Sequence, residues 1–181
     1  MTDQILDTLI YYNRECPLLA ICGDGLLTPR DFSINPTMLH TGCLRGYYMR
    51  YSCQDGQLFL DQMTVRAVDG RYSKIGNLEP FQSFGEMWTA MTYAKLCEPV
   101  PYTGGIVIGR DFQREVKPIH PHKYFSYKSV TELLFENGKL QKEINYSEKF
   151  TENLRESGHI RDIFSLDYDF FYTITLSMYQ K

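Results

Sequence analysis

The chain has 181 residues, 43% of them hydrophobic, and a formal net charge of −3. This length and composition fit a globular protein with a substantial core and argue against disorder, and the charge excludes a global positive field that would gather nucleic acid or an anionic membrane. The first residues lack the basic start of a secretory signal, and no apolar run reaches the roughly 20 residues that span a bilayer. We therefore expect a soluble cytoplasmic protein.

The cysteines predict reduced thiols. Their number is odd and no Cys-x-x-Cys pair occurs, which argues against a disulfide scaffold and a zinc ribbon. The sequence also lacks a Walker loop, a nucleophile elbow and a glycine-rich dinucleotide turn, so we expect no cofactor. The five cysteines are Cys16, Cys22, Cys43, Cys53 and Cys97.

In chain order, the first segment, 5–12, fits either a strand or a helix, because its apolar residues also lie on one helical face. Residues 18–27 are expected to form a strand interrupted by glycines, and residues 28–41 a loop. A hairpin follows: one strand over 45–53, a turn at Asp55 and Gly56, and a return strand over 57–65. On the first of these strands, Tyr47 and Tyr48 fall on opposite sides.

The second part of the chain predicts a similar series of strands and loops. Residues 69–85 read as a loop, 88–96 as a strand or a helix, and 105–108 as a short apolar strand. After a loop over 112–123, alternation over 128–146 around Asn137 and Gly138 predicts a second hairpin with a type I′ turn. We expect a short helix that Ser147 caps and that ends before Gly158, and a last strand over 172–179.

The order of several residue types recurs after about 80 residues. The plainest case is the triplet Arg-Asp-Phe, at 30–32 and again at 110–112. The sequence therefore predicts a duplication within a single domain over 1–181, with similar halves over about 5–86 and 87–181. The predicted fold is mainly β, an antiparallel sandwich or barrel-like sheet built from two tandem halves with one or two short helices.

The repeated triplets allow two interpretations. In the structural one, each ends a strand, where Asp accepts turn amides, Arg makes a partly exposed ion pair and Phe anchors the core. In the functional one, Arg30 and Arg110 line a shared pocket for a small anionic ligand. His40 and His122 hold equivalent positions in the two halves, and no spacing of metal ligands accompanies them, so no metal site is expected.

The first hairpin carries guanidinium and aromatic groups, including Arg45, Tyr47, Tyr48 and Arg50, whereas the second carries acidic residues. This asymmetry makes a nucleic-acid groove unfavourable and favours a one-sided protein interface. The leading hypothesis is a small cytoplasmic non-enzymatic protein that binds a protein partner, for example an inhibitor or immunity-type protein. The alternative is a small-ligand-binding barrel or sandwich that could be enzymatic, with Arg30, Arg110, His40 and His122 around a pocket.

Overall fold

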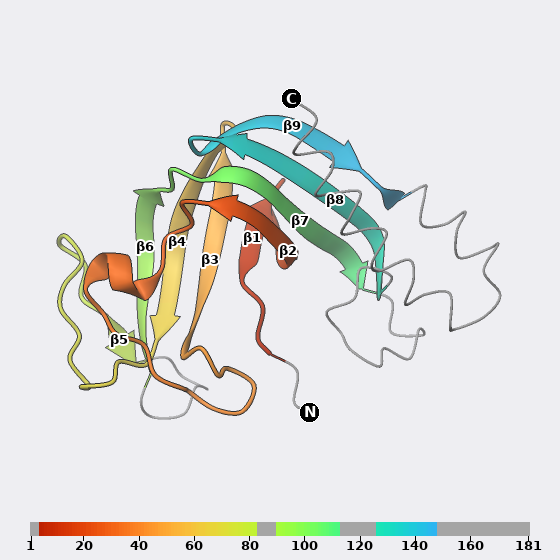
Figure 1. The fold of residues 1–181 in the computed structure, drawn as a ribbon. Coiled ribbons are helices and arrows are strands. Elements are labelled where there is room, and N and C mark those ends of the chain that lie inside the picture. Colours follow the sequence, from red (N-terminus) through yellow and green to blue (C-terminus); the bar gives the residue numbers. More distant parts are fainter. Residues whose placement is uncertain (1–3, 83–89, 113–125, 148–181) are drawn as a thin grey trace.

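The computed structural model describes residues 4–82, 90–112 and 126–147, and the fold is mainly β (Figure 1). Nine strands and one 3-10 helix occur in these residues. The elements are β1 Thr8–Tyr11, β2 Arg14–Asp24, η1 Pro29–Phe32, β3 Tyr47–Gln54, β4 Gln57–Val65, β5 Phe81–Gln82, β6 Met91–Pro99, β7 Thr103–Phe112, β8 Tyr127–Glu136 and β9 Lys139–Asn145.

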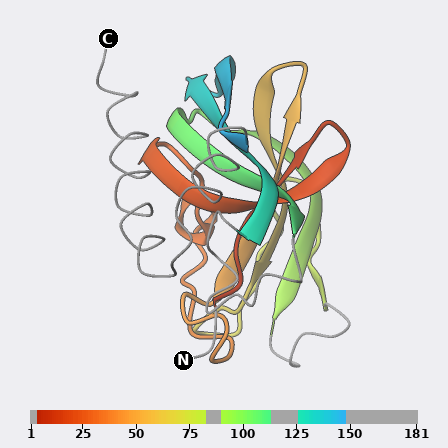
Figure 2. The same ribbon diagram turned by 90° about the vertical axis from the view of Figure 1, so that its right-hand side faces the viewer.

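The strands form one sheet that closes on itself. Its order is β3-β1-β2-β7-β8-β9-β4-β6-β5, and a further pairing of β3 with β4 turns the first seven strands into a ring (Figures 1 and 2). β4 and β9 meet only at Gln57 and Lys139, so the ring closes there through a single pair. The barrel-like alternative of the predicted fold is therefore the one that the structure shows.

The alternation predicted for the first hairpin is confirmed. Met49 and Tyr51 face the core and are each 1% exposed, while Tyr47 and Cys53 continue the same row at its partly buried ends. Inside the ring, aliphatic and aromatic side chains from seven strands pack together, among them Leu9, Leu60 and Ile106, so side chains fill the interior.

Both hairpins predicted from the sequence form, and their turns meet. Asp55 and Gly56 connect β3 to β4, and Asn137 and Gly138 connect β8 to β9, all four with positive φ. The Leu58 amide donates to the Gly138 carbonyl at 2.8 Å, and the Leu140 amide donates to the Gly56 carbonyl at 2.7 Å. These bonds between the two turns close the ring at the upper edge of Figure 1.

One strand pair corrects the prediction of an antiparallel sheet. β1 pairs with β3 in parallel, from Thr8 opposite Arg50 to Ile10 opposite Ser52, so the sheet is mixed. The parallel pair arises because β1 and β2 form a hairpin that enters the ring next to β3. Segment 5–12 thus contains a strand, as does 88–96 in its described part, Met91 onward.

The structure does not show the two-half repeat. Residues 30–32 form η1, whereas residues 110–112 end β7, and consecutive strands β1 and β2 pair while β6 and β7 do not. The expected last strand over 172–179 lies outside the described residues, as does the expected helix apart from Ser147. No helix in the described part is long and apolar enough to cross a membrane.

Buried tyrosines predict a loss of stability at alkaline pH. Burial raises the pKa of Tyr51, Tyr93 and Tyr102 above the ordinary value of about 10. The unfolded chain loses these protons first, so the contribution of these tyrosines to stability is constant below about pH 10 and is lost as the pH rises through their folded-state pKa values. In a tyrosinate absorbance titration, these rings should ionise together with unfolding. Reversible ionisation of all 14 tyrosines near pH 10 with the fold intact would contradict this expectation.

Candidate functional site

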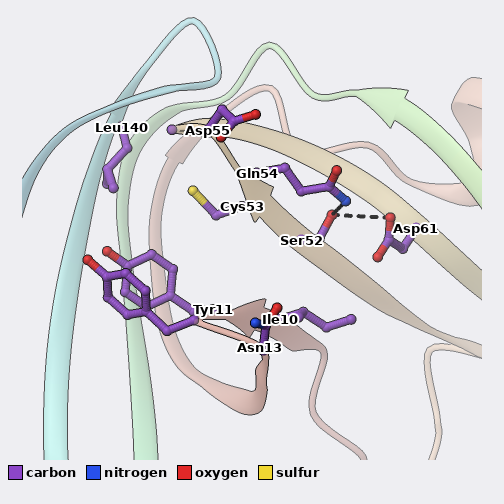
Figure 3. Close-up of a pocket in the computed structure, with 11 residues that line it drawn as sticks. Ile10, Tyr11, Asn13, Ser52, Cys53, Gln54, Asp55, Asp61 and Leu140 are labelled. Carbon is purple, nitrogen blue, oxygen red and sulfur yellow. Dashed lines mark hydrogen bonds between the residues drawn. The ribbon is translucent and has the colours of Figure 1, made fainter.

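A cleft of about 530 Å³ opens at the edge of the ring where the turns gather (Figure 3). We call it the hairpin cleft. The end of β1 and its turn form one wall, the tip of the β3–β4 hairpin forms the other, and Leu140 of β9 lies at one end. Its lining residues are Ile10, Tyr11, Tyr12, Asn13, Ser52, Cys53, Gln54, Asp55, Gly56, Asp61 and Leu140.

The cleft exists because β1 and β3, which pair in parallel, separate at their ends. Pairing of β1 with β3 ends at Ile10 and Ser52. Beyond that point Tyr12 and Asn13, with φ of 47° and 58°, turn the chain back into β2, while β3 continues to Gln54. The strands therefore separate, and their two turns become the walls of a notch in the sheet.

Aromatic side chains form the inner wall of the hairpin cleft. The rings of Tyr11 and Tyr12 lie 4.4 Å apart between centroids, tilted by 51°. Tyr11 is 4% exposed and donates its hydroxyl to Glu143 of β9 at 2.9 Å, whereas Tyr12 is 69% exposed. The Tyr11 side chain is thus fixed by a contact with the far side of the barrel, whereas the Tyr12 side chain is exposed.

The outer wall is polar. Asp61 is the extra residue of a bulge in β4, where the pairing register shifts between Leu60 and Gln62. Its Oδ1 accepts a hydrogen bond from the Ser52 hydroxyl at 3.1 Å, and the Gln54 amide donates to the same hydroxyl at 3.1 Å. These contacts hold the three side chains in a row along the mouth (Figure 3).

Cys53 lies between the two walls, and its thiol points into the hairpin cleft (Figure 3). Burial raises the pKa of this thiol, and a backbone hydrogen bond from Gly56 opposes the rise. The neutral thiol is a poor nucleophile, so it acts here as a small apolar surface. All five cysteines are free, and in the described ranges no group of three or more potential ligands could hold a metal ion.

Of the residues predicted to bind, Arg45 and Tyr47 are held within the protein. Both terminal nitrogens of Arg45 bond Asp7, at 2.6 and 3.0 Å, and the guanidinium lies 4.8 Å from the centre of the Tyr47 ring. Asp7 also accepts the Met49 amide at 2.6 Å. Burial raises the pKa of the Asp7 carboxyl, and the facing guanidinium opposes that rise. This cluster joins the segment before β1 to β3.

Tyr48 and Arg50 lie on the other face of β3, in the same row as Ser52 and Gln54. Tyr48 packs against a small cluster around Leu39. Arg50 is partly buried, and it lies opposite Thr8 of β1. This row connects two of the predicted binding residues to the hairpin cleft.

The structure does not bring the two triplets together, because η1 and the end of β7 lie on opposite sides of the fold (Figure 1). Asp31 of the first triplet accepts the Thr28 amide at 2.7 Å, as the structural interpretation of a turn expects. Next to Arg110, Asp111 forms an exposed ion pair with Arg14 at 3.7 Å.

His40, which the structure describes, does not line the hairpin cleft. His40 accepts the Gly42 amide at 3.1 Å in the loop before β3, and His122 lies outside the described residues. Sequence reasoning missed Tyr11 and Asp61 as candidates. Asn13 was the available signal, because Asn between two apolar runs favours a tight turn and hence a hairpin at this point.

No protein-family model, curated protein or solved structure matches this chain. The structure by itself shows a mainly β protein with a ring of strands, a packed interior and a cleft at the edge of the ring.

Proposed function

We propose that this protein is a non-enzymatic binding module that takes up a protein partner at the hairpin cleft. The observation that carries the proposal is the position of the cleft. It lies at an edge where two turns and a partly unpaired strand end surround an exposed tyrosine, whereas the interior is packed. Tyrosine at such a position offers a rigid contact surface at low entropic cost.

Two of the binding residues predicted from the sequence, Tyr48 and Arg50, would extend the binding surface beyond the hairpin cleft. Tyr48 and Arg50 continue the row of Ser52 and Gln54 along β3, so a partner in the cleft would also reach them. An inhibitor or immunity-type role fits a module that covers a site on another protein. The five free cysteines support a reducing compartment such as the cytoplasm.

A small-ligand-binding barrel is the second candidate. The volume of about 530 Å³ falls within the range typical of small-molecule sites, which favours it. Such a ligand would lie among the tyrosines and carboxylates of the hairpin cleft. An anionic ligand would instead need arginines such as Arg30 or Arg110, which lie elsewhere.

Filling the cleft should abolish partner binding. Gln54→Trp places a large ring at an exposed strand position on the cleft wall, where tryptophan is compatible with a strand. Lys128→Trp is the matched control, because Lys128 is exposed on β8 at the end far from its turn. Immobilised wild type and Lys128→Trp should capture the same protein from cells that express the chain, and Gln54→Trp should lose it.

The folded state of each variant is checked by circular dichroism and thermal unfolding. Capture of that protein by all three baits in equal amounts would place the partner away from the cleft and reject the proposal.

A further inference from the structure

Acidic carboxyl groups line the hairpin cleft. Asp55 and Asp61 line it, and among the residues that the structure describes no Lys, Arg or His lines it. Glu143 lies just behind the inner wall, bonded to the Tyr11 hydroxyl. These carboxylates favour a cation over an anion as the occupant of the cleft.

The two walls differ in polarity. Tyr11 and Leu140 lie at one end of the hairpin cleft, and Ser52 and Asp61 lie at the other (Figure 3). The Tyr12 ring lies beside that of Tyr11, 4.4 Å away between centroids. A ligand that matches this gradient has an apolar part and a charged end. Arginine and lysine side chains have this form, because a methylene stem carries their cationic head.

We propose that the hairpin cleft binds an arginine or lysine side chain of the partner protein. The stem packs against the tyrosine rings and Leu140, and the head lies against Asp61 at the polar end, with Asp55 adding negative charge at the cleft. A carboxylate can accept about four hydrogen bonds, and the Ser52 hydroxyl uses one position on Asp61, so the carboxylate keeps capacity for a charged donor. The exposed ring of Tyr12 adds a cation–π surface. This inference rests on the proposed function and specifies its partner.

The test uses capped tripeptides, Ala-Arg-Ala and Ala-citrulline-Ala, in which citrulline keeps the shape of arginine without its charge. Binding is measured by amide chemical shifts in two-dimensional NMR spectra. The arginine peptide should shift the amides of Asn13 and of residues 53–56 in a saturable way, and the citrulline peptide should bind about tenfold more weakly. Equal binding of the two peptides would overturn the inference.

Isosteric variants separate charge from shape. Asp55→Asn with Asp61→Asn should weaken the arginine peptide about tenfold. Asp69→Asn is the control, because Asp69 is an exposed carboxylate beyond the opposite end of β4 and asparagine can still accept the Arg71 amide. Undiminished binding to the doubly neutralised protein would also overturn the inference. Capped arginine amide, tested alone, should bind more weakly than the tripeptide; equal affinity would show a site for a free small cation and not for a partner's side chain.

The two proposals can fail separately. If the partner is lost with Gln54→Trp but retained in full by the doubly neutralised variant, the binding function stands and the basic side chain is rejected. If the arginine peptide binds as expected while Gln54→Trp captures the partner normally, the partner does not use the cleft, and both the proposed function and the inference about its side chain are rejected.

Discussion

Replacing Arg45 by Met is expected to lower the free energy of unfolding by about 3 kcal/mol. Asp7 is 7% exposed, and the substitution leaves its carboxylate without the two guanidinium bonds at 2.6 and 3.0 Å. Breaking one side of a buried pair costs about 3 to 5 kcal/mol, and the lower end applies because the Arg45 side chain is 38% exposed. Urea unfolding followed by circular dichroism measures the loss.

Two further variants show whether the loss comes from the buried charge. Combining Asp7→Asn with Arg45→Met should recover part of the stability, because no uncompensated carboxylate remains and asparagine can still accept the Met49 amide. Arg14→Met breaks the exposed pair with Asp111 and should change stability by no more than about 0.5 kcal/mol. Equal losses for Arg45→Met and Arg14→Met would show that the Asp7 pair contributes no more than a surface ion pair.

Replacing Gly138 by Ala should cost about 3 kcal/mol. Its φ is +77°, and an added Cβ would lie 2.2 Å from the Val100 carbonyl oxygen and 2.5 Å from the Gln57 side-chain nitrogen. The turn would have to move, which strains the bonds from the Gly138 amide to Tyr102 and from the Leu58 amide to Gly138. These contacts close the ring, so the loss measures the stability that closure provides.

Gly56→Ala is the matched control, because Gly56 holds the same position in the other hairpin. Its φ is +76°, but an added Cβ would meet nothing within 4 Å. This variant should lose only the cost of positive φ for alanine, about 1 kcal/mol. Urea unfolding of both variants gives the comparison. A similar loss for the two would mean that the turns do not pack against one another as described.

The sequence predicted the features that depend on near neighbours. The turns at Asp55–Gly56 and Asn137–Gly138 are local signals, and both hairpins form. The first hairpin has the predicted faces, whereas a register shift on the second places Leu140 and Ile144 in different clusters. The Arg-Asp-Phe triplets, in contrast, suggested a repeat that the structure does not show. Identical tripeptides can occur in a 3-10 helix and at a strand end, because neighbours decide their conformation.

The candidate site could not be predicted, because its parts are distant in sequence. Tyr11 and Glu143 are 132 residues apart, and Asp7 and Arg45 are 38 apart. The parallel pairing of β1 with β3 creates the hairpin cleft, and nothing in either segment indicates which strand it will join. The sequence predicted Arg45 and Tyr47 as binding residues. In the structure Asp7 bonds the Arg45 guanidinium, which lies over the aromatic ring of Tyr47.

The central claim is that the hairpin cleft is where this protein binds its partner. The measurement that tests it most directly is the dissociation constant of the purified partner for wild type, Gln54→Trp and Lys128→Trp. We predict that Gln54→Trp weakens binding by about a hundredfold or more, the loss of roughly 3 kcal/mol expected when a central contact is blocked, and that Lys128→Trp binds like wild type. Equal dissociation constants for Gln54→Trp and wild type would contradict the claim.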